Sequence, residues 1–112
     1  MKKDLEKEVE AVKKLFIISL SSMSFLQKKF LPVPAVGAGK LAKKIINFAS
    51  RKMQAAQTLD ELAFYSDLEE MGRQLLASCY DGNLHASPED FLTILIKIEY
   101  LLAKLEDEES GQ

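Results

Sequence analysis

The C-terminal part of the chain contains the stretch that decides the fold, SPEDFLTILIKIEYLLAKL, residues 87–105. Ser87 can cap a helix and Pro88 suits the first helical position. The carboxylates of Glu89 and Asp90 interact favourably with the positive N-terminal end of the helix dipole. Apolar residues recur every three or four positions, as on the buried face of an amphipathic helix; they are Phe91, Ile94, Leu95, Ile98, Leu101, Leu102 and Leu105. The stretch therefore predicts a helix from about residue 88 to residue 105.

A second helix is predicted before it, from Thr58 to about Tyr80. Thr58 and Glu61 have the spacing of a capping box, in which a hydroxyl and a glutamate cap the same helix end. Residues 81–83, Asp-Gly-Asn, favour the left-handed conformation that ends a helix. The apolar face of this helix consists of Phe64, Leu68, Met71, Leu75 and Cys79, with Tyr65 and Leu76 beside them.

A third helix is predicted over about 40–57, after a segment that reverses the chain. That segment, residues 31–39, contains two prolines and two glycines, which are typical of a turn. The apolar side of this helix carries Leu41, Ile45, Ile46, Phe48, Ala49, Met53 and Ala56.

The N-terminal helix is predicted over about 3–30. Its main apolar stripe consists of Leu5, Val9, Val12, Phe16, Leu20, Met23 and Phe30. Ile17, Ile18 and Phe25 point to the opposite side at 100° per residue. A helix that is apolar all round is either buried on several faces or meets another chain. We favour the second interpretation and expect Ile17, Ile18 and Phe25 to form a protein interface.

These patterns together predict an all-α protein, a four-helix up-and-down bundle in which the N-terminal helix is the longest and most buried. The short connections after the predicted 40–57 and 58–80 helices favour antiparallel neighbours. One domain should cover residues 1–105, and residues 106–112 should form an acidic flexible tail.

Charge is divided unevenly along the chain. Residues 1–57 have a net charge of +8 and residues 58–112 a net charge of −10, although the whole chain has a net charge of only −2. Between residues 11 and 59 there is no aspartate or glutamate. This separation either holds the halves together or offers a basic face to an anionic partner.

The basic residues of the predicted 40–57 helix lie on one side of it, and we call them the basic ridge: Lys40, Lys43, Lys44 and Arg51, with Lys52 at its edge. Such a ridge suits the phosphate oxygens of nucleic acid or of anionic lipid. The alternative is that the ridge is solvated or pairs with the acids of the 58–80 helix.

Catalytic, cofactor and metal signatures are not found in the sequence. Cys79 lies on an apolar stripe, where a thiol acts as a small hydrophobic group. His85 is the one histidine, so a site with two histidines within one chain is excluded. We therefore expect a protein that is not an enzyme, with no cofactor, no metal and no small-molecule substrate.

The favoured function is a small helical interaction protein, acting as a homodimer, an adaptor or a subunit of a larger assembly. Nucleic acid bound on the basic ridge is the alternative, and a membrane surface is less favoured. The single cysteine does not require an oxidising compartment, and the acidic residues before the apolar run 15–26 do not fit a secretory signal. We expect the protein to be cytoplasmic.

Overall fold

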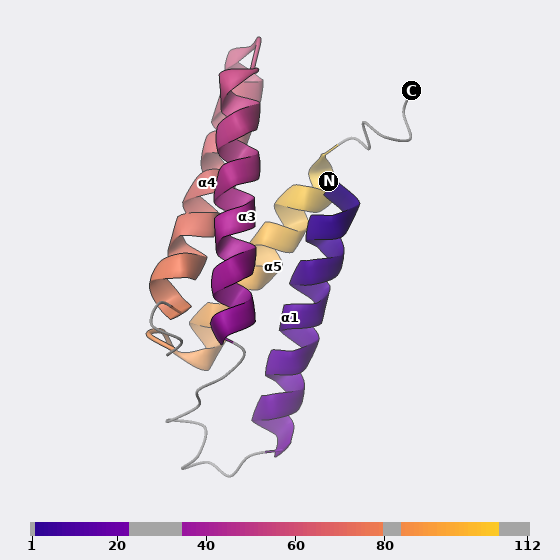
Figure 1. Cartoon of the computed structure of the whole chain (residues 1–112), viewed down its shortest axis with the longest axis vertical. Coiled ribbons are helices and arrows are strands. Elements are labelled where there is room, and N and C mark those ends of the chain that lie inside the picture. The colour runs from indigo at the N-terminus through magenta and orange to yellow at the C-terminus, as the bar shows by residue number, and fades with distance from the viewer. Residues whose placement is uncertain (1, 23–34, 80–83, 106–112) are drawn as a thin grey trace.

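The computed structural model describes residues 2–22, 35–79 and 84–105, and these residues form an all-helical fold. The helices in these ranges are α1 (Lys2–Ser22), α3 (Ala35–Gln54), α4 (Leu59–Cys79) and α5 (Pro88–Lys104) (Figure 1). The prediction of an all-α protein is confirmed.

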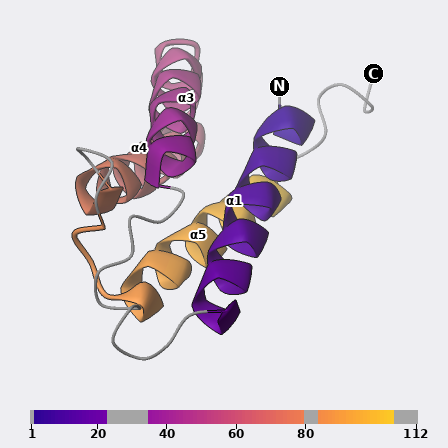
Figure 2. The same ribbon diagram turned by 60° about the horizontal axis from the view of Figure 1, so that its bottom comes forward.

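The closest packing in the molecule is between α3 and α4, which form an antiparallel pair (Figure 1). The other antiparallel pair is α1 and α5, which lie side by side and are inclined to α3 (Figure 2). Contacts of α4 with α5 and of α1 with α3 join the two pairs. Because the pairs are inclined to each other, the structure does not confirm a regular up-and-down bundle.

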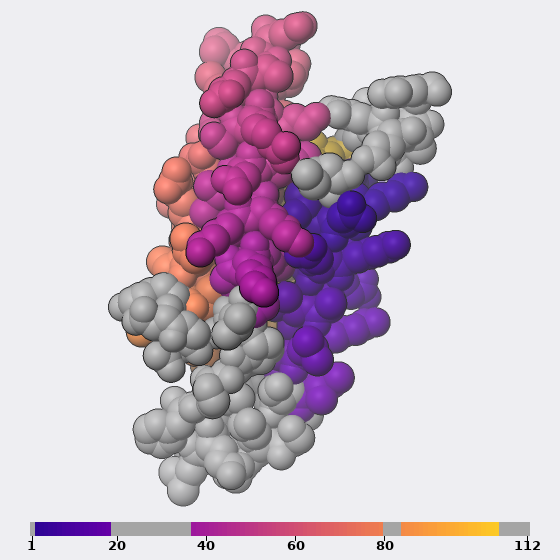
Figure 3. All heavy atoms as spheres, in the orientation of Figure 1, coloured from indigo at the N-terminus to yellow at the C-terminus, as the bar shows by residue number. Residues whose placement is uncertain are grey.

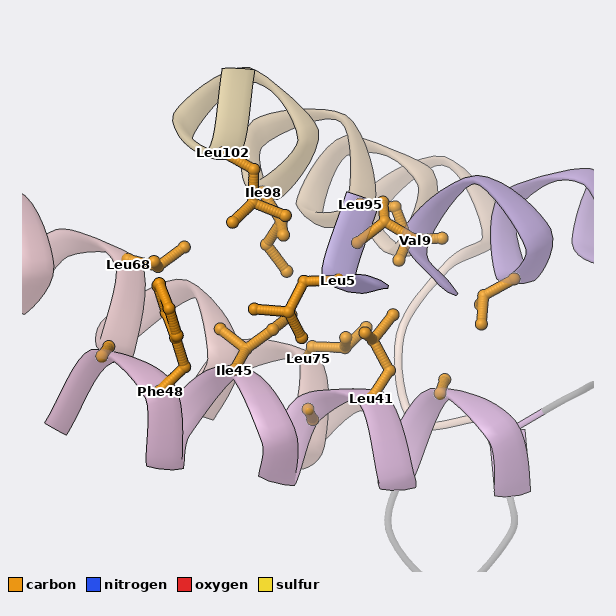
Figure 4. Packing of buried hydrophobic residues seen from close by; sticks show 14 of the residues in the cluster. Leu5, Val9, Leu41, Ile45, Phe48, Leu68, Leu75, Leu95, Ile98 and Leu102 are labelled. Carbon is orange, nitrogen blue, oxygen red and sulfur yellow. The ribbon is translucent and has the colours of Figure 1, made fainter. Parts of the chain in front are cut away.

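The core lies between the two pairs and contains predicted apolar residues from all four helices (Figure 4). From the predicted face of α1 it contains Leu5, Val9, Val12 and Phe16, while Leu20, Met23 and Phe30 are not among the described side chains. Phe16 of α1 and Phe91 of α5 are fully buried, and their ring centroids are 4.7 Å apart. The other large, fully buried side chains are Leu5, Val9, Leu41, Ile45, Leu68, Leu75, Leu95, Ile98 and Leu102.

Both predicted N-terminal caps are present. The backbone N–H of Glu61 donates to Thr58 Oγ1 at 3.1 Å, and the Thr58 hydroxyl lies 3.4 Å from Glu61 Oε1. The backbone N–H of Asp90 donates to Ser87 Oγ at 3.1 Å. These hydrogen bonds satisfy donors that a helix start leaves unpaired, so α4 and α5 begin where the sequence predicts.

The start of α3 differs from the prediction, because the helix begins at Ala35 and not near Lys40. Gly37 and Gly39 are therefore helical residues and not part of a turn. A glycine inside a helix costs about 1 kcal/mol relative to alanine. Burial of Ala38 and Leu41, both fully buried, offsets this cost and extends the helix.

The predicted rank of the N-terminal helix is not confirmed either. Among the described residues α1 and α4 each have 21 residues, so α1 is not the longest. Several large apolar side chains of α1 are exposed, which does not fit a most-buried helix. The predicted helical residues 23–30, with Phe25, and the predicted tail 106–112 lie outside the described residues.

Candidate interaction surfaces

The outer side of α1 exposes three large apolar side chains within one turn of the helix. Leu15 is 55% exposed, Ile17 45% and Ile18 62%, whereas Phe16 between them is fully buried. Leu5, Val9, Val12 and Phe16 already occupy the side of α1 that faces the core. Successive residues are turned by about 100°, so Leu15 and Ile17 point to the two sides of α1 and Ile18 points away from the core.

Two of the three predicted interface residues, Ile17 and Ile18, thus have side chains at the surface. Phe25 lies outside the described residues. Leu15 was not singled out in the sequence analysis. Its position directly before the buried Phe16 was the signal that could have indicated it. We call Leu15, Ile17 and Ile18 the apolar face of α1.

The basic ridge belongs to α3, and Figure 3 shows α3 beside α1 on one face of the molecule. Lys40, Lys43 and Arg51 are exposed, and none of them makes an ion pair with another residue in the described ranges. The ridge residue Lys44 is engaged: its Nζ lies 2.6 Å from Glu8 Oε1 of α1. Lys52 is partly buried, with its Nζ 5.7 Å from the centroid of the Phe48 ring.

A shallow groove runs between α1 and α3 next to this ion pair. Its α3 wall is formed by Lys44, Asn47 and Arg51. Its α1 wall carries Asp4 and Glu8 together with Leu5 and Lys7. The acidic partner of the ridge is therefore the start of α1, and not α4 as the sequence analysis considered.

The acids of α4 face a different side of the molecule. Asp67 and Glu70 line a second groove with Lys97, Tyr100 and Leu101 of α5. Asp60 lies two turns before Asp67 on the same side of α4 and is also exposed. We call Asp60, Asp67 and Glu70 the acidic row. None of them makes an ion pair with another residue of the described part.

Cys79 is placed as the sequence predicts, on the buried side of α4. Its side chain is 2% exposed, and the thiol donates to the carbonyl oxygen of Leu75 at 2.9 Å. Burial raises the pKa of this thiol from its ordinary value of 9.0 to about 11. The reactive thiolate is therefore disfavoured. Within the residues that the structure covers, no cluster of three or more His, Cys, Asp or Glu side chains could hold a metal ion.

Comparison with models of protein families, with curated proteins and with solved structures finds no match for this chain. None of the helices in the described ranges has the length and apolar character needed to cross a membrane.

Proposed function

We propose that this chain is a small helical interaction protein without enzymatic activity, which binds a protein partner through the apolar face of α1. The partner is a second copy of the chain or another subunit of an assembly. The other three helices hold α1 in place. The protein works in the cytoplasm.

The exposure of Ile18 is the observation that carries this proposal. Its side chain is 62% exposed, and Leu15 and Ile17 beside it are about half exposed. Exposed apolar side chains that lie next to one another mark interaction sites, because contact with a partner removes them from water. A partner also explains why α1 carries large apolar residues on a side that the core does not cover.

The test is Ile18→Asp, followed by light scattering behind size exclusion at high salt. High salt screens ion pairs and leaves apolar association intact. We expect the wild-type protein to have a mass above that of the monomer and the variant to be a folded monomer. The change in the free energy of unfolding should stay below about 1 kcal/mol, because the residue is exposed.

Val9→Asp is the matched control, because Val9 lies on the same helix and is fully buried. This variant should unfold, since a charge in the core is left unpaired. An unfolded Ile18→Asp variant would show that the side chain belongs to the core. A wild-type monomer at high salt would exclude a second copy as the partner of this face.

A nucleic acid is the second candidate partner, and the exposed residues Lys40, Lys43 and Arg51 favour it. Phosphate contacts of this kind release counterions, so the affinity should fall steeply with salt. Fluorescence anisotropy with a short DNA duplex tests this at two salt concentrations. Replacing these three residues by glutamine should remove the binding, whereas Ile18→Asp should leave it unchanged.

A further inference from the structure

We propose that Lys40, Lys43 and Arg51 of the basic ridge dock on the acidic row, Asp60, Asp67 and Glu70, of a second copy of this chain. This contact uses neither Ile17 nor Ile18, so it does not depend on the interface proposed for α1. It gives the separation of charge along the chain a role in self-association.

The spacing of the two sets of charges matches when the helices are antiparallel. Along α3, Lys43 follows Lys40 by three residues, and Arg51 comes eight residues later. Read backwards along α4, Asp67 comes three residues after Glu70, and Asp60 comes seven residues further on. At a rise of 1.5 Å per residue the sets extend over about 16 Å and about 15 Å.

In this alignment the pair Lys40 and Lys43 lies opposite Glu70 and Asp67, and Arg51 lies opposite Asp60. Each set also lies within an arc of about 80° on its helix at 100° per residue. Three cations can therefore meet three carboxylates along one line of contact. Asn47 and Ala63, between the charges of the two sets, are both exposed and add no further charge.

The structure explains why these charges do not pair within one chain. The ridge faces α1, since Lys44 pairs with Glu8 and Arg51 lines the groove against α1. The acidic row faces α5, since Asp67 and Glu70 line the groove with Lys97. Arg51 of the ridge and Asp67 and Glu70 of the acidic row thus line different grooves, and no ion pair joins the two sets within the described part of one chain.

Because the two surfaces differ, the contact is heterologous. An assembly of any length keeps one unused basic ridge at one end and one unused acidic row at the other end. Chains of molecules can therefore grow head to tail. Exposed ion pairs are weak and screened by salt, so the association should weaken about tenfold or more between low and high salt.

Two variants test the contact, because each removes one surface. The first is Lys40→Gln, Lys43→Gln and Arg51→Gln, and the second is Asp60→Asn, Asp67→Asn and Glu70→Gln. Lys44 is left unchanged to preserve its ion pair with Glu8. All proteins in this test also carry Ile18→Asp, so that the apolar face of α1 does not contribute. Sedimentation velocity at low salt, over about two decades of concentration, should show a growing mass for the protein with both charged surfaces intact and a monomer for each variant.

An equimolar mixture of the two variants should form a 1:1 dimer that does not grow, because one complete contact remains. A control with Lys3, Lys14 and Lys104 changed to glutamine removes equal charge at residues that line neither groove, and it should associate like the protein with both charged surfaces intact. Ile18→Asp should also retain this salt-sensitive association, so the two proposals can fail separately.

Three results would overturn the inference: an Ile18→Asp protein that stays monomeric at low salt, a mixture of variants that stays monomeric, or a charge control that behaves like the first variant. Loss of DNA binding in the first variant, without any self-association of the wild type, would assign the ridge to nucleic acid instead.

Discussion

Cys79 shows how the position of a single residue decides its chemistry. The thiol lies against the core at the end of α4 and donates to Leu75 of the preceding turn. Removal from water disfavours its charged form, which is why the pKa rises to about 11. The residue therefore acts as a small buried group that fills space.

The raised pKa predicts a dependence of stability on pH. Above about pH 9.0, the ordinary pKa, the thiol of the unfolded chain loses its proton, while the folded protein keeps it up to about pH 11. The unfolded state then binds fewer protons, so the free energy of unfolding falls as the pH rises through this range. For each pH unit in this range, the free energy of unfolding of the wild-type protein should fall by up to about 1.4 kcal/mol more than that of Cys79→Ala. Denaturant unfolding of both proteins at several pH values measures the difference, and equal slopes would contradict it.

At the scale of the helix, Gly72 explains the close approach of α3 and α4. A Cβ atom at this position would lie 3.0 Å from Ile46 Cγ1, 3.1 Å from Ile45 Cγ2 and 3.4 Å from the carbonyl oxygen of Ala42. The missing side chain lets the turns of α3 pack directly on α4. Gly39 differs, because a Cβ atom there would meet nothing within 4 Å.

This contrast predicts opposite effects for two substitutions of helical glycines. Gly72→Val should lower the free energy of unfolding by about 1–3 kcal/mol, because the larger side chain overpacks the contact with Ile45 and Ile46. Gly39→Ala should raise it by about 0.5–1 kcal/mol, because alanine loses less conformational freedom in a helix. Urea unfolding followed by circular dichroism measures both. A valine variant as stable as the wild type would show that α3 can move away without cost.

At the scale of the whole molecule, α1 is joined to the chain's other end. Lys2 Nζ donates to the carbonyl oxygen of Leu105 at 2.8 Å, and Lys13 pairs with Glu99 at 2.8 Å. Further along both helices, the rings of Phe16 and Phe91 meet in the core. Exposed or half-exposed ion pairs contribute little, so the aromatic contact should provide most of the stabilisation.

Phe16→Ala should therefore lower the free energy of unfolding by about 3–5 kcal/mol, since it removes a fully buried ring and leaves a cavity. Lys13→Ala should cost only about 1 kcal/mol or less, because the pair with Glu99 is partly exposed to solvent. Thermal unfolding at one pH and one salt concentration compares the two variants. A larger loss for Lys13→Ala would reverse our ranking of these contacts.

The sequence alone determined the helical class, the starts of α4 and α5, and most of the residues that form the core faces. A cap depends on residues three apart, such as Thr58 with Glu61 and Ser87 with Asp90, and an apolar face depends on the helical period. These are local properties, so they are visible without knowledge of the fold. The same logic predicted that Cys79 is buried.

The tertiary structure decided what depends on contacts between distant segments. It extended α3 back through Gly37 and Gly39, where burial of Ala38 outweighs the helix propensity of the glycines. It also paired Lys44 with Glu8 and left Lys40, Lys43 and Arg51 without an ion pair in the described part of the chain. Helical periodicity gives the direction of a side chain around its own helix, whereas the neighbouring helices decide whether that direction is covered.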